Sequence, residues 1–155
     1  MLFNNNNHKH EIDLERYSPC YIEVERWKHK AVRRFTGLKL KDVVEILDAE
    51  VCTEVDDWGD IPIISGCGSD LMSDVLAFIK PNCLLLTGLM NSQVIRTAEI
   101  ADIRAICFVR GKKPDIDLMN LARSSNIPLF ATRLAMFESC GKLYEKGLLG
   151  VTQER

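Results

Sequence analysis

The stretch Ile63–Val75 reads IISGCGSDLMSDV and joins an apolar, strand-like run to a glycine-rich turn and then to polar residues at helical spacing. If a helix begins at Ser69 or Asp70, its free backbone N–H groups gather at the carboxyl end of a strand, where small anionic ligands commonly bind. The stretch therefore predicts a strand–turn–helix unit with a ligand site at its turn. It indicates binding and does not indicate a reaction.

The rest of the chain repeats the alternation of short apolar strands with helices of about ten residues. Such βαβ units favour a mainly parallel sheet covered by helices on both faces. We therefore expect an α/β fold of three layers (αβα) with a doubly wound sheet of about five strands. The expected strands are 51–53, 61–65, 83–87, 105–109 and 129–131, and the expected helices are 71–79, 92–101, 115–124 and 134–145. A short helix before them has Leu38, Leu40, Val43, Val44, Ile46 and Leu47 on one face, with Thr36 as its N-cap.

The chain divides into a polar beginning and one folded domain. With 155 residues and 46% apolar side chains it can bury one proper core. Residues 1–36 hold an asparagine run, all three histidines and a basic cluster, and we expect a polar N-terminal tail or docking arm there. The domain is expected over residues 37–149, followed by a short C-terminal tail, 150–155.

The net charge and the cysteine pattern indicate which partners and which cellular compartment to expect. A net charge of −2 provides no basic field, so we expect neither nucleic acid nor membrane as a partner. Six cysteines without a Cys-x-x-Cys pair are typical of free, buried thiols in a reducing compartment. No signal peptide is visible, and the longest apolar run, near residues 83–90, is too short to span a bilayer. We expect a cytoplasmic protein.

The carboxyl ends of parallel strands meet at one edge of a sheet, so four loops are expected to form a ligand crevice: 66–70, 87–92, 110–114 and 132–133. The alternative is that Ser69, Asp70, Ser92 and Thr132 are ordinary helix N-caps. The candidate ligand-binding residues are Gly66, Gly68, Ser69, Asp70, Ser73, Asp74, Thr87, Gly88, Asn91, Ser92, Gly111, Lys112 and Thr132.

Catalytic and metal chemistry find little support in the sequence. Asp70 and Asp74 have helical spacing and can in principle share a metal, but a solvated pair is the simpler interpretation. Cys67 has no histidine in the predicted domain to activate it. P-loop, dinucleotide and zinc spacings are all missing from the sequence. We expect no catalytic residue, no metal and no cofactor.

An ordered series of motifs resembles the DRTGG domain family over residues 38–148. The series consists of Gly66-x-Gly-Ser69-Asp70-Leu71-x-Ser73-Asp74-Val75, Lys80-Pro81, Arg110-Gly111-Lys112-Lys113-Pro114, Ile127-Pro128-Leu129 and Leu143-Tyr144. The resemblance implies a regulatory and dimeric module, similar to the N-terminal, non-catalytic domain of HPr kinase/phosphorylase. Similar domains accompany CBS pairs in regulated pyrophosphatases. The Asp-Arg-Thr-Gly-Gly string that names the family is absent, and the loop expected in its place, residues 87–92, reads TGLMNS.

Two hypotheses follow for function. The first is a non-catalytic sensor that binds a small phosphate-bearing metabolite or nucleotide and signals through dimer or partner contacts. The alternative is a protein-interaction or dimerisation scaffold without a ligand, and an enzyme that uses the Ser-Asp loop is the least favoured. We expect a homodimer formed through spare apolar residues such as Met90, Phe137 and Leu148-Leu149. In the sensor hypothesis, Asp70→Asn is expected to weaken ligand binding.

Overall fold

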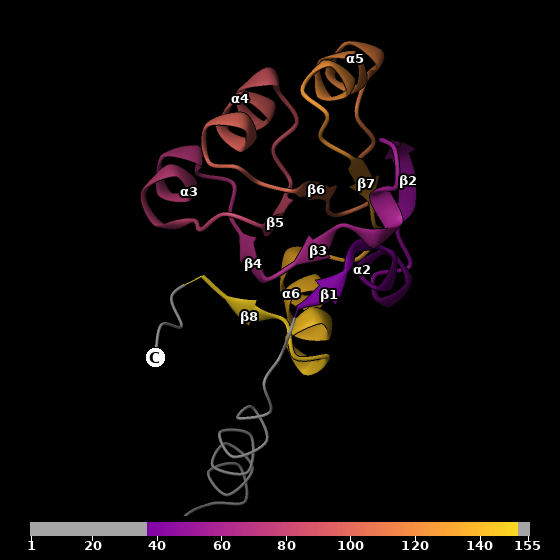
Figure 1. Ribbon diagram of the computed structural model, residues 1–155, viewed down its shortest axis with the longest axis vertical. Helices are drawn as coiled ribbons and strands as arrows, with labels where there is room; N and C mark the ends of the chain where they lie inside the picture. Colours follow the sequence, from indigo (N-terminus) through magenta and orange to yellow (C-terminus); the bar gives the residue numbers. More distant parts are fainter. Residues whose placement is uncertain (1–36, 152–155) are drawn as a thin grey trace, which may run out of the picture. The chain divides into compact units, whose positions relative to one another are not determined.

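The computed structural model describes residues 37–151, so the predicted N-terminal tail and residues 152–155 lie outside the described part. The elements of this part alternate as the sequence predicts (Figure 1). They are β1 (Leu38–Lys39), α2 (Leu40–Ile46), β2 (Glu50–Thr53), the 3-10 turn η2 (Trp58–Asp60), β3 (Pro62–Ile63), β4 (Ser65–Gly68), α3 (Met72–Phe78), β5 (Cys83–Thr87), α4 (Ser92–Ile100), β6 (Ala105–Phe108), α5 (Ile116–Ser124), β7 (Leu129–Ala131), α6 (Met136–Glu145) and β8 (Leu149–Gly150).

The main sheet has six strands in the order β2-β7-β6-β5-β4-β8. Every neighbouring pair is parallel except β2 and β7, which run antiparallel at one edge. This confirms the predicted mainly parallel sheet. The sixth strand is β8, which pairs Leu149 with Ser65 of β4 and extends to Gly150, one residue beyond the predicted end of the domain. A separate antiparallel pair joins β1 to β3.

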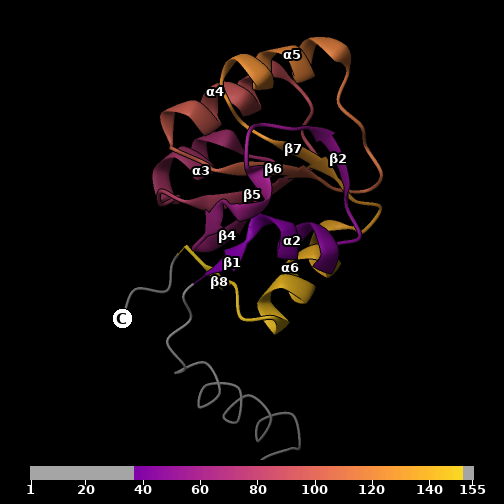
Figure 2. The same ribbon diagram turned by 45° about the vertical axis from the view of Figure 1, so that its right-hand side comes forward.

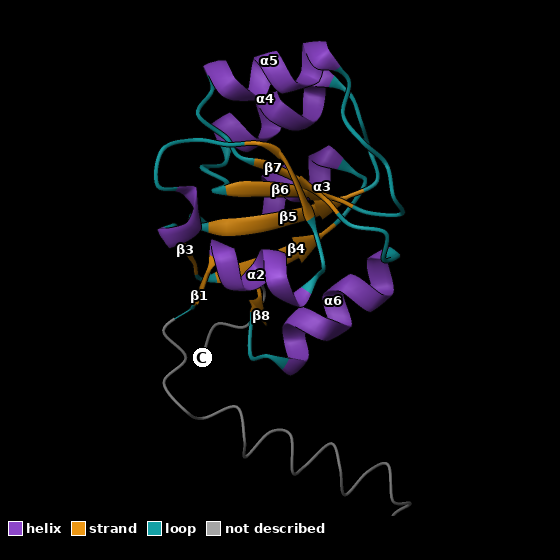
Figure 3. Ribbon diagram, turned by 90° about the vertical axis from the view of Figure 1, so that its right-hand side faces the viewer, coloured by secondary structure: helices purple, strands orange, loops and turns teal. Residues whose placement is uncertain are grey.

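Successive side chains along the strands point to opposite faces of the sheet and pack in two apolar cores, one on each face. Leu85 and Phe108 pack with residues of α3, α4 and α5, whereas Leu84 and Phe130 pack with residues of α2 and α6. Figures 2 and 3 show these two helix groups on opposite sides of the strands. The three-layer αβα fold is confirmed.

The first helix begins later than predicted. Lys39 is the N-cap of α2, and its backbone N–H donates to the carboxylate of Asp42 at 3.2 Å. The predicted cap at Thr36 is therefore wrong. Leu38 belongs to β1 instead, where it pairs with Ile63. In this strand the side chain of Leu38 packs against the same apolar core as the residues of α2.

The glycine-rich segment is a strand and not a turn. The expected strand 61–65 ends at Ile63, and β4 runs through Gly66 and Gly68. A Cβ on Gly68 would lie 2.8 Å from the sulfur of Cys140, and one on Gly66 would lie 3.1 Å from a methyl of Leu148. These glycines let α6 and the segment after it approach the sheet closely. The helix that follows runs over Met72–Phe78, within one residue of the predicted range 71–79 at each end, so it does not begin at Ser69 or Asp70 as the hypothesis of a helix N-terminus at the ligand site requires.

Candidate functional site

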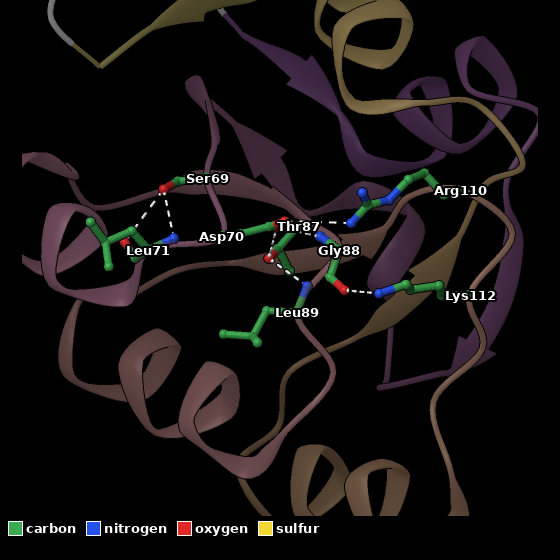
Figure 4. A network of polar contacts seen from close by, with 8 residues as sticks. All are labelled: Ser69, Asp70, Leu71, Thr87, Gly88, Leu89, Arg110 and Lys112. Atoms are coloured by element: carbon green, nitrogen blue, oxygen red, sulfur yellow. Dashed lines mark hydrogen bonds and ion pairs between the residues drawn. The ribbon is translucent and has the colours of Figure 1, made fainter.

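The carboxyl ends of β4, β5 and β6 bring three loops together at one edge of the sheet (Figure 4). Asp70 follows β4, the turn Thr87–Leu89 ends β5, and Arg110 and Lys112 follow β6. The parallel register aligns these three strand ends, because Gly68 pairs with Leu86 and Thr87 pairs with Phe108. We call the cluster of Asp70, Thr87, Gly88, Arg110 and Lys112 the edge site.

Asp70 is held by donors from the two neighbouring strands. One carboxylate oxygen accepts the backbone N–H of Gly88 at 2.6 Å and the hydroxyl of Thr87 at 2.9 Å. The other oxygen lies 3.4 Å from Nη2 of Arg110. Asp70 therefore does not cap a helix: the N-cap of α3 is Leu71, and the carboxylate points to the end of β5 instead.

The turn after β5 is fixed on both sides. Nζ of Lys112 donates to the carbonyl oxygen of Gly88 at 2.6 Å, while the N–H of Leu89 donates to the hydroxyl of Thr87 at 3.1 Å. A side chain at position 88 would collide with the guanidinium of Arg110. Glycine at this position thus permits the observed close approach of the Arg110 guanidinium to the backbone turn.

A left-handed turn in the backbone orients the side chains of Arg110 and Lys112. Arg110 and Gly111 have φ values of +64° and +67°, and the first of these is an uncommon conformation for a residue with a side chain. Their N–H groups donate to the carbonyl oxygens of Leu134 and Thr132, both at 2.8 Å. These bonds secure the strained turn to the neighbouring loop, so Arg110 and Lys112 are directed toward Gly88.

The edge site has an excess of positive charge. Its charged side chains are two cations and one carboxylate, and the side chains of Arg110 and Asp70 are 53% and 50% exposed. The bond from the Gly88 N–H is the main cause that lowers the pKa of Asp70; the Thr87 hydroxyl and the charges of Arg110 and Lys112 act in the same direction, while partial burial opposes them. Asp70 is therefore ionised at neutral pH and neutralises only part of the local charge.

We expect Asp70→Asn to lower the free energy of unfolding by about 1 kcal/mol at pH 7, because an amide oxygen accepts the two short bonds less strongly than a carboxylate. Since the folded pKa lies below the unfolded one, Asp70 stabilises the fold above its unfolded pKa of about 4. This contribution is lost as the pH falls through the lowered pKa. Urea denaturation at pH 7 and at about pH 2 checks this.

The difference between wild type and Asp70→Asn should shrink at the lower pH, and a difference that stays constant contradicts the assigned bonds. Asp74→Asn is the matched variant, since Asp74 is exposed on α3 and makes none of these contacts. It separates the loss of this particular carboxylate from the loss of any negative charge near α3.

Several predicted ligand residues have structural partners. The hydroxyl of Ser69 accepts the N–H of Leu71 at 3.1 Å within its own loop. The side chain of Asn91 caps α4 by accepting the N–H of Gln93, so the alternative that made Ser92 the cap is wrong by one residue. Ser92 is instead the first residue of the helix.

Thr132 is buried, with 2% of its surface exposed. Its hydroxyl donates to the carbonyl oxygen of Leu47 at 2.7 Å and accepts the N–H of Leu134, so it ties the end of β7 to α2 rather than facing a crevice. Ser73 and Asp74 lie exposed on α3. Of the thirteen predicted residues, the structure brings Asp70, Thr87, Gly88 and Lys112 together in the edge site.

Arg110 is the member of the edge site that the candidate list lacks. A signal for it exists in the sequence, because it is the first cation after the strand ending at Phe108 and it precedes a glycine. Its left-handed backbone, which turns the side chain back toward Gly88, has no equally clear signal.

The cysteine thiols of the described residues lie in surroundings that disfavour the thiolate. Burial raises the pKa of the Cys67 thiol, which disfavours the reactive thiolate. The five cysteines in residues 37–151 are free, and burial raises the pKa of both Cys83 and Cys107 to about 12. Within the same residues, no three histidine, cysteine or acidic side chains group together as metal ligands.

A hollow of about 540 Å³ lies at the opposite edge, near the amino ends of β5 and β6. Its polar groups are engaged with one another: Nε of Arg104 donates to Asn82 at 2.7 Å, and the hydroxyl of Ser125 donates to Glu99 at 2.6 Å. Arg104 also faces Asp102 at 3.7 Å. The charged residues of its lining are Glu99, Asp102 and Arg104, so the hollow has one more negative than positive charge and does not suit an anionic ligand.

None of the helices between residues 37 and 151 has the length and apolar character needed to cross a lipid bilayer.

Comparison with known proteins finds a solved structure with a similar fold. No family model matches the sequence, and no curated protein matches it. Among solved structures, the chain is similar to the CBS and DRTGG domains of the regulatory region of a Clostridium perfringens pyrophosphatase, complexed with the activator diadenosine tetraphosphate. The TM-score is 0.62 at 13% sequence identity, over 82% of this chain and 57% of that one. This chain is thus an α/β domain that shares its fold with that region and spans less than two thirds of its length.

Proposed function

We propose that the chain is a non-catalytic regulatory domain of the DRTGG type that binds a small phosphate-bearing metabolite or nucleotide at the edge site. The observation that carries the proposal is the convergence of two exposed cations, Arg110 and Lys112, on the buried turn at Gly88, where Lys112 donates to the carbonyl oxygen of Gly88 and Arg110 pairs with Asp70. Cations and backbone N–H groups at the carboxyl ends of parallel strands are the usual elements of an anion site. The structural neighbour supports the regulatory part, since its regulatory region was solved with a nucleotide activator.

The two cations suit phosphate in different ways. The planar guanidinium of Arg110 can give two parallel hydrogen bonds to phosphate oxygens, and the ammonium of Lys112 acts as a compact point charge. Thr87 and Gly88 supply an adjoining hydroxyl and backbone N–H. Binding that depends on these groups weakens as salt rises, because both cations are exposed enough to be screened.

We expect Lys112→Ala to weaken the binding of a phosphate compound by about tenfold, with binding that depends less on salt. Thermal-shift screening of phosphate, pyrophosphate, mononucleotides and dinucleoside polyphosphates finds the compound, since binding to the folded state raises its stability. Titration calorimetry then gives the affinity. Lys113→Ala is the matched control, because this neighbouring lysine pairs with Glu50 on β2 and should leave binding unchanged.

A scaffold without a ligand is the second candidate. Exposed apolar side chains support it: Leu71, Leu76 and Phe78 on and before α3 are 57%, 46% and 64% exposed, and Phe137 on α6 is 89% exposed. Leu148, predicted as a spare apolar residue, is buried in the core. A flat screen of phosphate compounds together with a dimer mass in light scattering would overturn the sensor and leave a homodimeric scaffold. Cytoplasmic location is part of the same proposal.

A further inference from the structure

The donors that suit a phosphate group are already occupied by a side chain of the protein. The carboxylate of Asp70 accepts the N–H of Gly88, the hydroxyl of Thr87 and the guanidinium of Arg110. These are charge-assisted bonds of the kind that phosphate oxygens form with such donors. Figure 4 shows the carboxylate on one side of the turn at Gly88 and Lys112 on the other.

Asp70 and a ligand phosphate cannot use these donors together. The N–H of Gly88 has one hydrogen, which points to the carboxylate at an N–O distance of 2.6 Å. A phosphate oxygen that takes its place would meet the carboxylate at contact distance, where two anions repel each other. Without displacement of Asp70, a phosphate reaches only the outer surfaces of Arg110 and Lys112.

We infer that Asp70 is an internal competitor of the ligand and sets the affinity of the edge site. This inference rests on the proposed function, and it assigns to Asp70 the opposite role from a ligand-orienting residue. Binding of a phosphate group at the Gly88 N–H requires the carboxylate to leave. The observed affinity is therefore reduced by the fraction of molecules in which Asp70 occupies the donors.

The move of Asp70 is local, because its flanks are fixed. The N–H of Ser69 donates to Leu86 on β5 at 3.0 Å, and the carbonyl of Leu71 accepts the first backbone bonds of α3. Only the short loop 69–71 separates these anchors. Displacement of Asp70 is therefore confined to its own side chain and to this loop, and the rest of α3 stays in place.

The test measures the affinity for inorganic pyrophosphate by titration calorimetry at one pH and one ionic strength. Asp70→Asn should bind about tenfold more tightly than wild type, because a neutral amide competes less and repels less. Asp70→Ala should bind at least as tightly as Asp70→Asn. The matched control Asp74→Asn removes one carboxylate from the exposed face of α3 and should change the affinity much less.

A second measurement follows the amide of Gly88 by hydrogen exchange in NMR. Without ligand, this amide should be protected in wild type and exchange faster in Asp70→Ala, and pyrophosphate should restore its protection in the variant. This readout does not depend on the absolute affinity. An amide that exchanges equally in both proteins would overturn the occupied-donor arrangement.

The outcomes separate the two proposals. If Asp70→Asn binds no more tightly than Asp74→Asn while Lys112→Ala still weakens binding, the competitor role is overturned and the edge site stands. If Asp70→Asn gains affinity but Lys112→Ala and Lys113→Ala are alike, competition is supported and the assigned role of Lys112 in the proposed function is overturned. If pyrophosphate binds to Asp70→Asn and not to wild type, the competitor role is supported, whereas pyrophosphate sensing by the wild-type protein is overturned. If it binds to none of the proteins, both proposals fall for pyrophosphate.

Discussion

Phe108→Ala is expected to lower the free energy of unfolding by about 3–5 kcal/mol, the largest effect of any substitution considered for this chain. Phe108 has none of its surface exposed and packs in the core shared by the sheet and helices α3, α4 and α5. Removing the ring leaves a cavity that rigid neighbours from three helices cannot refill. Since small domains have a stability of about 5–15 kcal/mol, this loss is a large part of the total. Urea denaturation measures it.

Phe108→Leu is the matched control and should cost about 1 kcal/mol, because leucine keeps most of the apolar volume. Phe108 also pairs with Thr87 in the sheet and precedes Arg110 by two residues. A destabilised variant should therefore lose phosphate binding as it unfolds. A loss of less than about 1 kcal/mol for Phe108→Ala would contradict the fully buried position of this ring.

The inner strands of the sheet could be predicted because a strand that is buried on both faces is a continuous apolar run in the sequence. Residues 83–87 form an apolar run between Pro81-Asn82 and Gly88, and β5 has the predicted bounds. All five residues of this strand are buried. A continuous apolar run of this length bounded by turn residues is typical of an inner parallel strand.

The segment Ser65–Gly68 could not be predicted in the same way. Glycines in a turn and glycines in a strand beneath a close helix give the same local pattern. Only the later helix α6, which brings Cys140 against Gly68, decides between them. The helix that follows could still be predicted, since Met72–Phe78 lies within one residue of the predicted range 71–79 at each end.

The convergence of the edge-site loops could be predicted from the sequence, but the contacts of their residues could not. Parallel strands place their following loops at one edge, so the sequence predicts Asp70, Gly88 and Lys112 near one another. The partners of Asp70 lie 17, 18 and 40 residues away, and the partner of Thr132 lies 85 residues away. Such pairings depend on strand register and loop conformation, and the residue types alone do not specify them.

Gly37→Ala is expected to cost about 2–3 kcal/mol, the second largest effect, for two reasons that act together. Gly37 has a φ of +88°, which strains any residue with a side chain. A Cβ there would also lie 2.5 Å from the carbonyl oxygen of Ile63, a backbone atom that cannot rotate away. The strain falls on the pairing of β1 with β3, which leads into α2.

Gly141→Ala provides a control of opposite sign. Gly141 lies inside α6, where a new Cβ would meet no atom within 4 Å, so alanine should stabilise the helix by about 0.5–1 kcal/mol. The same chemical change thus tests two environments, and urea denaturation of both variants compares them directly. If Gly37→Ala were as stable as wild type, the β1–β3 pair would be able to shift without loss. The packing of Leu38 against the core would then contribute little to stability. In that case the start of α2 at Leu40 would depend on the capping bond from the Lys39 N–H to Asp42 and not on the β1–β3 pair.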